Sequence, residues 1–270
     1  VELSDFSNWS SVVKWAVPLY RAAGTNLPAG LQALISRWKE EPTPELRARR
    51  AVQFIQDEVR YTGLMDGLGS HHPAVPSETF QKRYGDCKGK ALLLCTILRE
   101  MDIPAWPALV SYSLREGVSQ YLPSPFLFDH VIVKMQLDGA KAWVDATRSH
   151  QAGDLYQRTI HRFGKALVIA EGNSDLEDVP SHYLFGGLKV RSVFKFRDYT
   201  NAARLEVSSE YSGWKAEDIR GFLYQKDPGK LAKDYLNYYD RYYPGIQLSS
   251  PPQIQDDLTN DVLRVTLTPA

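Results

Sequence analysis

Residues 85–98 read GDCKGKALLLCTIL, and this stretch decides the fold. Residues 91–98 are apolar except for one threonine, which is the composition of a helix buried on most of its sides. Asp86 suits the N-cap position, so we expect the helix to begin at Cys87 and to end before Pro104. The pattern before this stretch is mainly helical, and the pattern after it turns to strands.

The chain has only two cysteines, Cys87 and Cys95. Within one helix their separation is roughly 12 Å, more than a disulfide can span, so we expect two free thiols. Cys95 stands among leucines and is typical of core filling. Cys87 stands at the helix start, where unpaired N–H groups and a partial positive charge stabilise a thiolate and can face an oxyanion. That position alone does not make Cys87 catalytic, because a free cysteine can also simply fill space.

Composition excludes several classes of protein. The chain has 270 residues, is 43% hydrophobic, and carries 32 basic against 32 acidic side chains. These values are typical of a globular protein and exclude wholesale disorder. Zero net charge disfavours nucleic acid as the main partner, because phosphate binding needs a cationic excess. No run approaches the 18 apolar residues of a membrane span.

Three regions follow from the pattern along the chain. We expect a helical lead-in at 1–44, a core at 45–187 in which 60–84 is loop-like, and a C-terminal α+β region at 188–270. Core strands are expected at 105–113, 129–136, 141–146 and 165–170. In the last region the pattern predicts strands at 188–196, 203–211 and 262–268, and a helix over 214–243 that is interrupted at Pro228-Gly229. The strand at 262–268 leaves open that the region continues further. Its stripe of Tyr235, Tyr238, Tyr239 and Tyr242 favours packing of a helix on a sheet, with carbohydrate or peptide binding as the alternative.

A hairpin supplies a base and a group to orient it. Asp138-Gly139 is a strong signal for a two-residue turn between strands. The resulting register places Asp145 opposite Ile132, and His130 lies on the same face as Ile132. His130 and Asp145 then become diagonal neighbours, roughly 7–8 Å apart at the backbone. A four-residue loop keeps this relationship, whereas a three-residue loop would separate the two side chains onto opposite faces.

The same residues resemble a known family. Residues 85–88 (GDCK), 101–105 (MDIPA), 128–133 (FDHVIV) and 143–147 (WVDAT) are similar to the core of the transglutaminase-like superfamily, in the same order. Residues 57–61 (DEVRY) and 122–125 (LPSP) resemble one bacterial branch, in which this core follows an N-terminal β-rich domain, and the chain is expected to start just after that domain. Gly89 departs from the branch, which often has aspartate there.

The resemblance implies an α+β, papain-like fold in which the cysteine helix packs on an antiparallel sheet. Cys87 would attack an amide carbonyl, His130 would shuttle the proton, and Asp145 would hold the imidazole. Tyr61 is the candidate for binding the oxyanion, because animal transglutaminases use an aromatic residue before the cysteine. The acyl group would pass to water, as in a protease or amidase, or to an amine, as in cross-linking. A periplasmic or cell-envelope location is expected from the branch.

Other interpretations of the sequence remain open. The fold could serve as a binding module without turnover, or as a structural part of an envelope assembly that docks a partner through its tyrosine-rich region. His71-His72 lacks acidic or cysteine partners at ligand spacing, so we expect no metal and no cofactor. No glycine pattern of a serine nucleophile elbow is found. The expected partner is a peptide or protein substrate, and the oligomeric state stays undetermined.

Overall fold

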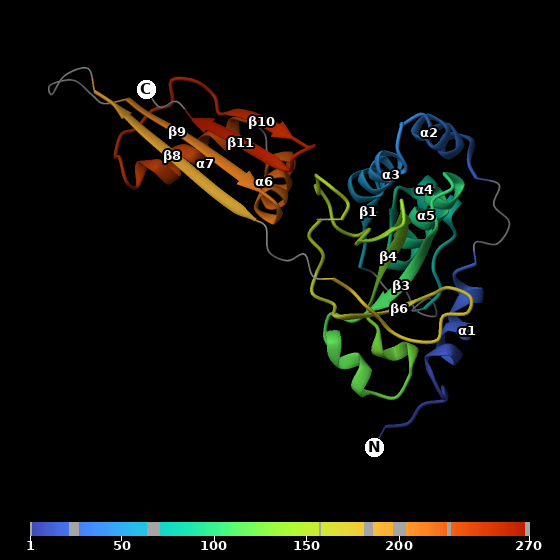
Figure 1. Cartoon of the computed structure of the whole chain (residues 1–270). Helices are drawn as coiled ribbons and strands as arrows, with labels where there is room; N and C mark the ends of the chain where they lie inside the picture. The colour runs from blue at the N-terminus through green and yellow to red at the C-terminus, as the bar shows by residue number, and fades with distance from the viewer. Residues whose placement is uncertain are drawn as a thin grey trace. The chain divides into compact units, whose positions relative to one another are not determined.

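The computed structural model describes residues 2–21, 27–63, 71–156, 158–180, 186–196, 204–225 and 228–267. The chain divides into two compact units (Figure 1). The first comprises Val1–Ser149 and Leu155–Tyr183, and the second comprises His150–Asp154 and Leu184–Ala270. Five residues from the middle of the chain therefore belong to the C-terminal unit. None of the described helices is both long and apolar enough to cross a membrane.

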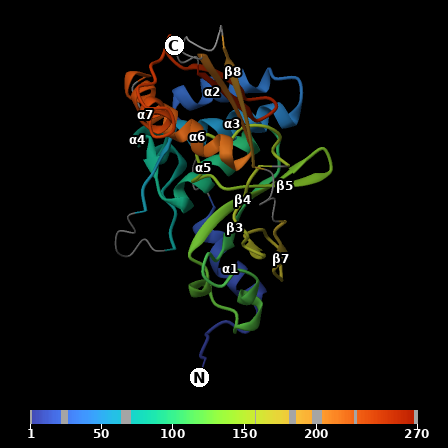
Figure 2. The same ribbon diagram turned by 90° about the vertical axis from the view of Figure 1, so that its left-hand side faces the viewer.

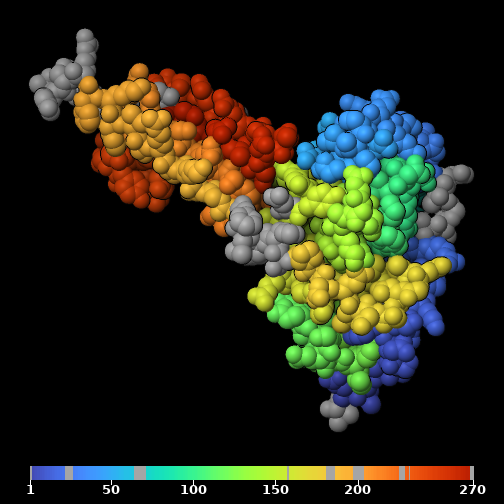
Figure 3. Space-filling view, viewed as in Figure 1, coloured from blue at the N-terminus to red at the C-terminus, as the bar shows by residue number. Residues whose placement is uncertain are grey.

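The helices of the first unit are α1 (Trp9–Leu19), α2 (Ala29–Lys39), α3 (Pro44–Glu58), α4 (Pro76–Lys82) and α5 (Cys87–Glu100). Helix α3 begins with Thr43 as N-cap and Pro44 in its first turn. Buried residues of α1 and α2, among them Val13 and Leu31, join the same hydrophobic core as α5. In the space-filling view these N-terminal helices, drawn in blue, lie directly on the rest of their unit (Figure 3). The separation of 1–44 as a lead-in stays a sequence-based division.

The sheet of the first unit is antiparallel throughout, with strand order β5-β4-β3-β6-β7. Its strands are β3 (Ala105–Val110), β4 (His130–Leu137), β5 (Ala140–Val144), β6 (Lys165–Val168) and β7 (Glu177–Asp178). Helix α5 packs on β3, the middle strand, and on its neighbour β4 (Figure 2). This arrangement confirms the expected cysteine helix on an antiparallel sheet. Each strand expected from 105 to 170 is present, with ends that differ by up to three residues.

Helix α5 is buried over almost its whole length, from Cys87 to Leu98. Its leucines share a core with Val131 and Val133, while Ile132, pointing the other way from β4, lies in a second core on the opposite face of the sheet. Each fully buried leucine or isoleucine contributes about 1.5–3 kcal/mol. Replacement of Leu94 by alanine would cost about 2–5 kcal/mol, because the surroundings collapse only partly into the cavity.

The segment from residue 60 to residue 84 is not the simple loop that the sequence predicted. It contains α4, which begins at Pro76 and ends at Lys82, followed by Arg83 as a C-cap in the left-handed conformation (φ 56°). Two short strands, β1 (Arg60–Tyr61) and β2 (Tyr84–Gly85), pair in parallel. The prediction failed for two reasons. The glycines and prolines around the seven-residue helix interrupt the helical periodicity that would reveal it, and the strand pairing joins residues that are far apart in the sequence. Two 3₁₀ helices, η2 (Arg115–Gln120) and η3 (Pro125–Leu127), lie further along.

The C-terminal unit has a four-stranded antiparallel sheet of order β10-β11-β9-β8, with two helices. Its elements are β8 (Gly187–Lys195), β9 (Arg204–Ser212), α6 (Trp214–Gln225), α7 (Pro228–Asp240), β10 (Gln253–Asp257) and β11 (Val262–Leu267). Residues 203 and 268 of the expected strands lie outside the described residues, and β10 was not expected. Tyr235 and Tyr239 pack on the sheet core as predicted, whereas Tyr238 and Tyr242 are exposed. A groove of about 320 Å³ lies beside this stripe.

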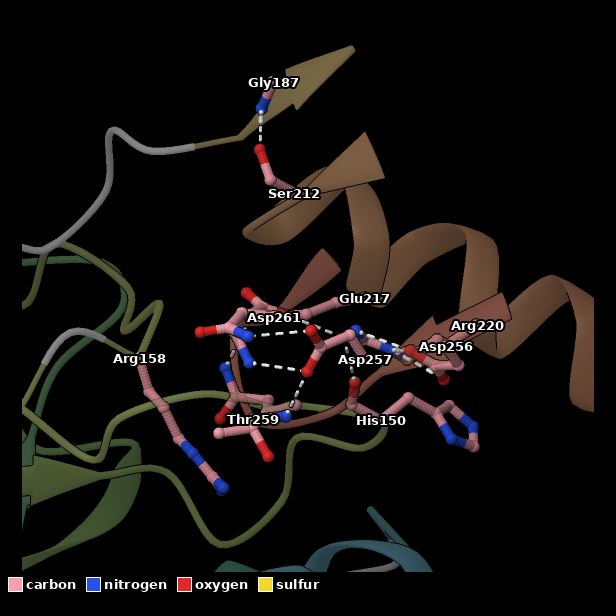
Figure 4. A network of polar contacts seen from close by, with 12 residues as sticks. His150, Arg158, Gly187, Ser212, Glu217, Arg220, Asp256, Asp257, Thr259 and Asp261 are labelled. Carbon is pink, nitrogen blue, oxygen red and sulfur yellow. Dashed lines mark hydrogen bonds and ion pairs between the residues drawn. The ribbon is translucent and has the colours of Figure 1, made fainter. Parts of the chain in front are cut away.

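A buried arginine holds the C-terminal unit together (Figure 4). The Arg220 side chain is only 1% exposed and forms ion pairs with Asp256 and Asp261 at 2.9 and 2.6 Å. Its Nη1 also donates to the carbonyl oxygen of His150 at 3.4 Å. Gly153 N donates to the carbonyl oxygen of Leu258 at 3.0 Å. These contacts explain why residues 150–154 belong to the C-terminal unit.

Candidate active site

Cys87 is the first residue of α5, as the sequence predicted, and its side chain is buried. Asp86 is the N-cap: its Oδ1 accepts a hydrogen bond from Gly89 N at 2.8 Å, and its Oδ2 pairs with Lys88 Nζ. The cap leaves the sulfur at the positive end of the helix dipole. Gly89 fits here because an added Cβ would lie 3.1 Å from the Thr79 hydroxyl oxygen.

Cys95 is a different kind of residue from Cys87. It is fully buried, and burial raises the pKa of its thiol to about 12. Both cysteines are free, so the expectation that they form no disulfide with each other is confirmed. Cys95 stays neutral in the core at physiological pH and serves packing.

The β4–β5 hairpin has the register that the sequence predicted. Leu137 pairs with Ala140, and Asp138 and Gly139 form the turn with positive φ of 46° and 84°. His130 Nε2 lies 3.0 Å from Asp145 Oδ2, and both side chains are buried. The expected meeting of imidazole and carboxylate is therefore present. His130 is the first residue of β4, and Asp145 directly follows β5.

The Asp145 carboxylate is fully hydrogen-bonded by the protein. Thr147 donates to Oδ1 from its backbone N at 2.8 Å and from its hydroxyl at 2.7 Å. Oδ2 accepts from His130 and, at 3.4 Å, from the Tyr112 hydroxyl. The Asp145 backbone oxygen accepts from Gln56 Nε2 at 2.9 Å. Four donors fill the acceptor sites of an ionised carboxylate, so the aspartate is held in one orientation.

The environment shifts the pKa values of the pair in opposite directions. Burial alone would lower the pKa of His130, but its hydrogen bonds to Asp145 and Cys87 and their charges raise it to about 10. Burial alone would raise the pKa of Asp145, but the bonds from His130 and Thr147 hold it below its usual range. At neutral pH the pair is therefore an imidazolium beside a carboxylate.

Tyr61 is brought to the cysteine by the small parallel strand pair. Tyr61 pairs with Gly85, two residues before Cys87, and Thr62 N donates to the carbonyl oxygen of Gly85 at 3.0 Å. Burial, followed by the negative charges of Cys87, Asp145 and Asp86, raises the pKa of the Tyr61 phenol. Tyr61 is 44% exposed, so it does not plug the interior of the site.

A cavity of about 400 Å³ opens beside Cys87 and His130. One wall is apolar and belongs to β3 and to the segment just before β4, with Leu109, Pro125, Phe126 and Phe128. The rest of the lining is formed by Val131 and by the more polar Tyr20, His71, Lys88 and Asp129. Phe126 is 79% exposed and therefore lies at the rim, leaving the cavity open to a ligand.

Three residues that sequence reasoning did not place here belong to the site. Gln56 carried a signal, because a glutamine within the apolar stripe of its helix needs a buried partner, which Asp145 provides. The sequence held no comparable signal for Tyr112 or His71, because each lies on a loop whose path depends on the whole fold. His71 is not part of a metal cluster: no group of three or more ligating side chains occurs among the residues that the structure describes.

The comparisons with known proteins agree with this fold. The sequence model of the transglutaminase-like superfamily matches residues 31–149, a range that contains Cys87, His130 and Asp145. Residues 31–149 are therefore similar to the core of this superfamily, as the motifs predicted. No curated protein matches the sequence.

Two solved structures are similar to the chain. A proposed protease from Parabacteroides distasonis aligns with a TM-score of 0.52 and 9% identity, over 98% of this chain and 52% of that one. A proposed cysteine protease from Cytophaga hutchinsonii aligns over 49% of this chain and 42% of that one, with 17% identity and a TM-score of 0.31. The first likeness confirms the α+β fold. This chain spans about half the length of that structure.

Proposed function

We propose that this protein is a cysteine-dependent acyl-transfer enzyme that hydrolyses peptide or isopeptide amides. The observation that carries the proposal is the imidazole of His130, which is hydrogen-bonded through Nε2 to Asp145 and interacts with Cys87 at the start of α5. A nucleophile, a base and a group that orients the base are the parts that thiol acyl transfer needs. The family, and the name of the Parabacteroides distasonis structure as a protease, support the same chemistry.

In the first half-reaction the sulfur of Cys87, as thiolate, attacks the amide carbonyl carbon and forms the C–S bond. The carbonyl electrons move to oxygen, and the Cys87 backbone N–H and the Tyr61 hydroxyl are the proposed donors to that oxyanion. When the intermediate collapses, the C–N bond breaks and the imidazolium of His130 gives its proton to the leaving amine. The product of this half-reaction is a thioester on Cys87.

In the second half-reaction water attacks the thioester carbonyl while neutral His130 takes one of its protons. The C–S bond breaks, a carboxylic acid leaves, and the thiolate–imidazolium pair is restored. Asp145 keeps its negative charge throughout and stabilises the imidazolium, because the four hydrogen bonds donated to its carboxylate favour the ionised form. An amine in place of water would form a new amide, which is the cross-linking alternative.

Labelling with iodoacetamide near neutral pH tests the nucleophile. We expect peptide mapping by mass spectrometry to find the label on Cys87 in the wild type and in the matched control Cys95→Ser, and no labelling of Cys87→Ser. Cys95 provides this control because it is fully buried and its thiol is neutral. Equal labelling of Cys87→Ser and the wild type would refute the proposal.

The choice between water and amine needs a separate measurement. The wild-type protein is incubated with peptide and isopeptide libraries, with and without an added primary amine. We expect products that have gained the mass of water, even with the amine present, and none from Cys87→Ala. Products that carry the amine instead would replace hydrolysis by transfer.

A further inference from the structure

We propose that Tyr112 is a positioning residue of this site, which orients the His130–Asp145 pair through its hydroxyl and shields the pair from water with its ring. Its ring centroid lies 4.9 Å from that of His130, and its hydroxyl lies 3.4 Å from Asp145 Oδ2. Tyr112 is thus in contact with both members of the pair. The inference rests on the proposed function, because a His130–Asp145 pair that takes no part in catalysis would not need to be aligned.

Tyr112 is fixed by the residue that precedes His130. Tyr112 N donates to Asp129 Oδ1 at 2.7 Å, and the hydroxyl of Ser113 donates to Asp129 Oδ2 at 3.0 Å. Asp129 N in turn donates to the carbonyl oxygen of Val110, the last residue of β3, at 3.2 Å. The loop after β3 is therefore tied back onto the chain at the entry to β4. Because Asp129 adjoins His130, this clamp places the Tyr112 side chain at the imidazole.

The hydroxyl of Tyr112 completes the hydrogen bonding of the carboxylate oxygen that holds the imidazole. Thr147 occupies Asp145 Oδ1, so Oδ2 is left to His130 and Tyr112. Burial and the charge of Asp145 raise the pKa of the Tyr112 phenol, so the hydroxyl stays a donor at physiological pH. An oxygen held between two donors cannot rotate towards one of them without losing the other. The imidazole then keeps one orientation towards Cys87.

The ring of Tyr112 belongs to an aromatic cluster around the imidazole. Phe163 stacks on His130 with centroids 5.8 Å apart, and Tyr112 lies 4.9 Å from Phe163 and 4.8 Å from His161. His130 is buried, whereas Tyr112 is 41% exposed, so Tyr112 lies at the solvent boundary of this cluster. Its ring limits the access of water to the hydrogen bond between His130 and Asp145.

Two variants separate the hydroxyl from the ring. Tyr112→Phe removes the hydroxyl alone, and Tyr112→Leu removes the ring as well. Tyr121→Phe is the matched control, because Tyr121 has the same 41% exposure and lies in the same unit, outside the lining of the cavity. All three are made in the full chain, and their folding is compared by circular dichroism.

The first readout is the rate at which iodoacetamide alkylates Cys87. We expect Tyr112→Phe to react roughly tenfold more slowly than the wild type, the effect of losing one hydrogen bond to a charged group, with Tyr121→Phe unchanged. The second readout is the proton NMR signal of His130 Nε2–H, assigned by its absence in His130→Gln. We expect this signal to shift in Tyr112→Phe and to broaden through exchange with water in Tyr112→Leu.

The two readouts distinguish the failure of this inference from the failure of the proposed function. If Cys87 is alkylated in the wild type but both Tyr112 variants keep its rate and its Nε2–H signal, Tyr112 has no positioning role. If wild-type Cys87 is not alkylated, the proposed function fails. The Nε2–H signal then still decides about Tyr112, because it reports the His130–Asp145 bond without any reaction.

Discussion

His130 Nε2 and Asp145 Oδ2 lie 3.0 Å apart although 15 residues separate them, because a two-residue turn sets the register of the hairpin that carries them. Side chains alternate between the faces of a strand, so the parity of the turn decides whether the two can meet. The turn at Asp138-Gly139 lies at the other end of both strands from the site. It nevertheless controls the geometry of the site.

Insertion of one alanine within β5, after Lys141, should therefore separate the pair. Leu137 stays opposite Ala140 at the turn, so the extra residue turns Asp145 to the face opposite His130 or unpairs the rest of β5. We expect the rate of Cys87 alkylation to fall at least tenfold. Insertion of two alanines at the same position is the matched control, because it keeps the parity of Asp145. Full reactivity after the single insertion, with the fold intact by circular dichroism, would contradict the argument.

The raised pKa of His130 predicts a pH-dependent contribution to stability. Its pKa is about 10 in the folded chain, against the ordinary value of 6.5 that represents the unfolded chain. The folded state thus binds the extra proton, and the stabilisation is complete below pH 6.5 and is lost as the pH rises towards 10. Buried Lys90, whose pKa burial lowers to about 8, acts with the opposite sign above that pH. The interval from pH 6.5 to about 8 isolates the histidine.

In that interval we expect the free energy of unfolding of Cys87→Ser to fall with pH relative to Cys87→Ser/His130→Gln, a background that removes the thiol which would otherwise give up the proton that His130 takes. The slope of the difference can reach about 1.4 kcal/mol per pH unit, the value for one proton. Urea unfolding of both proteins at several pH values measures it. A difference that is flat or rises across the interval would show that His130 is not held as an imidazolium in the folded chain.

The parts of the site that the sequence predicted are those set by local rules. A capping aspartate before an apolar block located Cys87 at a helix start, and a two-residue turn located His130 beside Asp145. Tyr112 could not be found in this way, because it is placed by Asp129 across a loop. Likewise, β10 was missed because Ile254 is its only apolar residue, and its pairing with β11 defines it as a strand.

Tyr61 provides a test of oxyanion binding. Tyr61→Phe removes the hydroxyl and keeps the ring on β1. We expect kcat to fall roughly 10²–10³-fold with little change in KM, because the bond forms only in the transition state. Tyr84→Phe is the matched control, since Tyr84 lies on the paired strand β2 with a similar exposure of 41%. Steady-state kinetics on a substrate from the library screen measure kcat and KM of both variants. An unchanged kcat in Tyr61→Phe would show that the Tyr61 hydroxyl does not bind the oxyanion.

Arg220 provides a test of the C-terminal unit. Arg220→Leu leaves Asp256 and Asp261 without their buried cation and releases the carbonyl oxygen of His150. Unpairing of a buried ion pair costs about 3–5 kcal/mol. We expect that loss of stability in this unit, with faster hydrogen exchange at residues 150–154 and 253–267.

Hydrogen exchange followed by mass spectrometry, peptide by peptide, measures the effect and locates it. Arg264→Leu is the matched control: Arg264 lies on β11 of the same unit and pairs with Glu210, but its side chain is 46% exposed. An exposed pair of this kind contributes about 1 kcal/mol or less, so we expect little change in exchange. Equal effects of the two substitutions would mean that Arg220 does not anchor residues 150–154. Faster exchange confined to Arg220→Leu would establish that the chain five residues beyond Asp145 is held by the C-terminal unit.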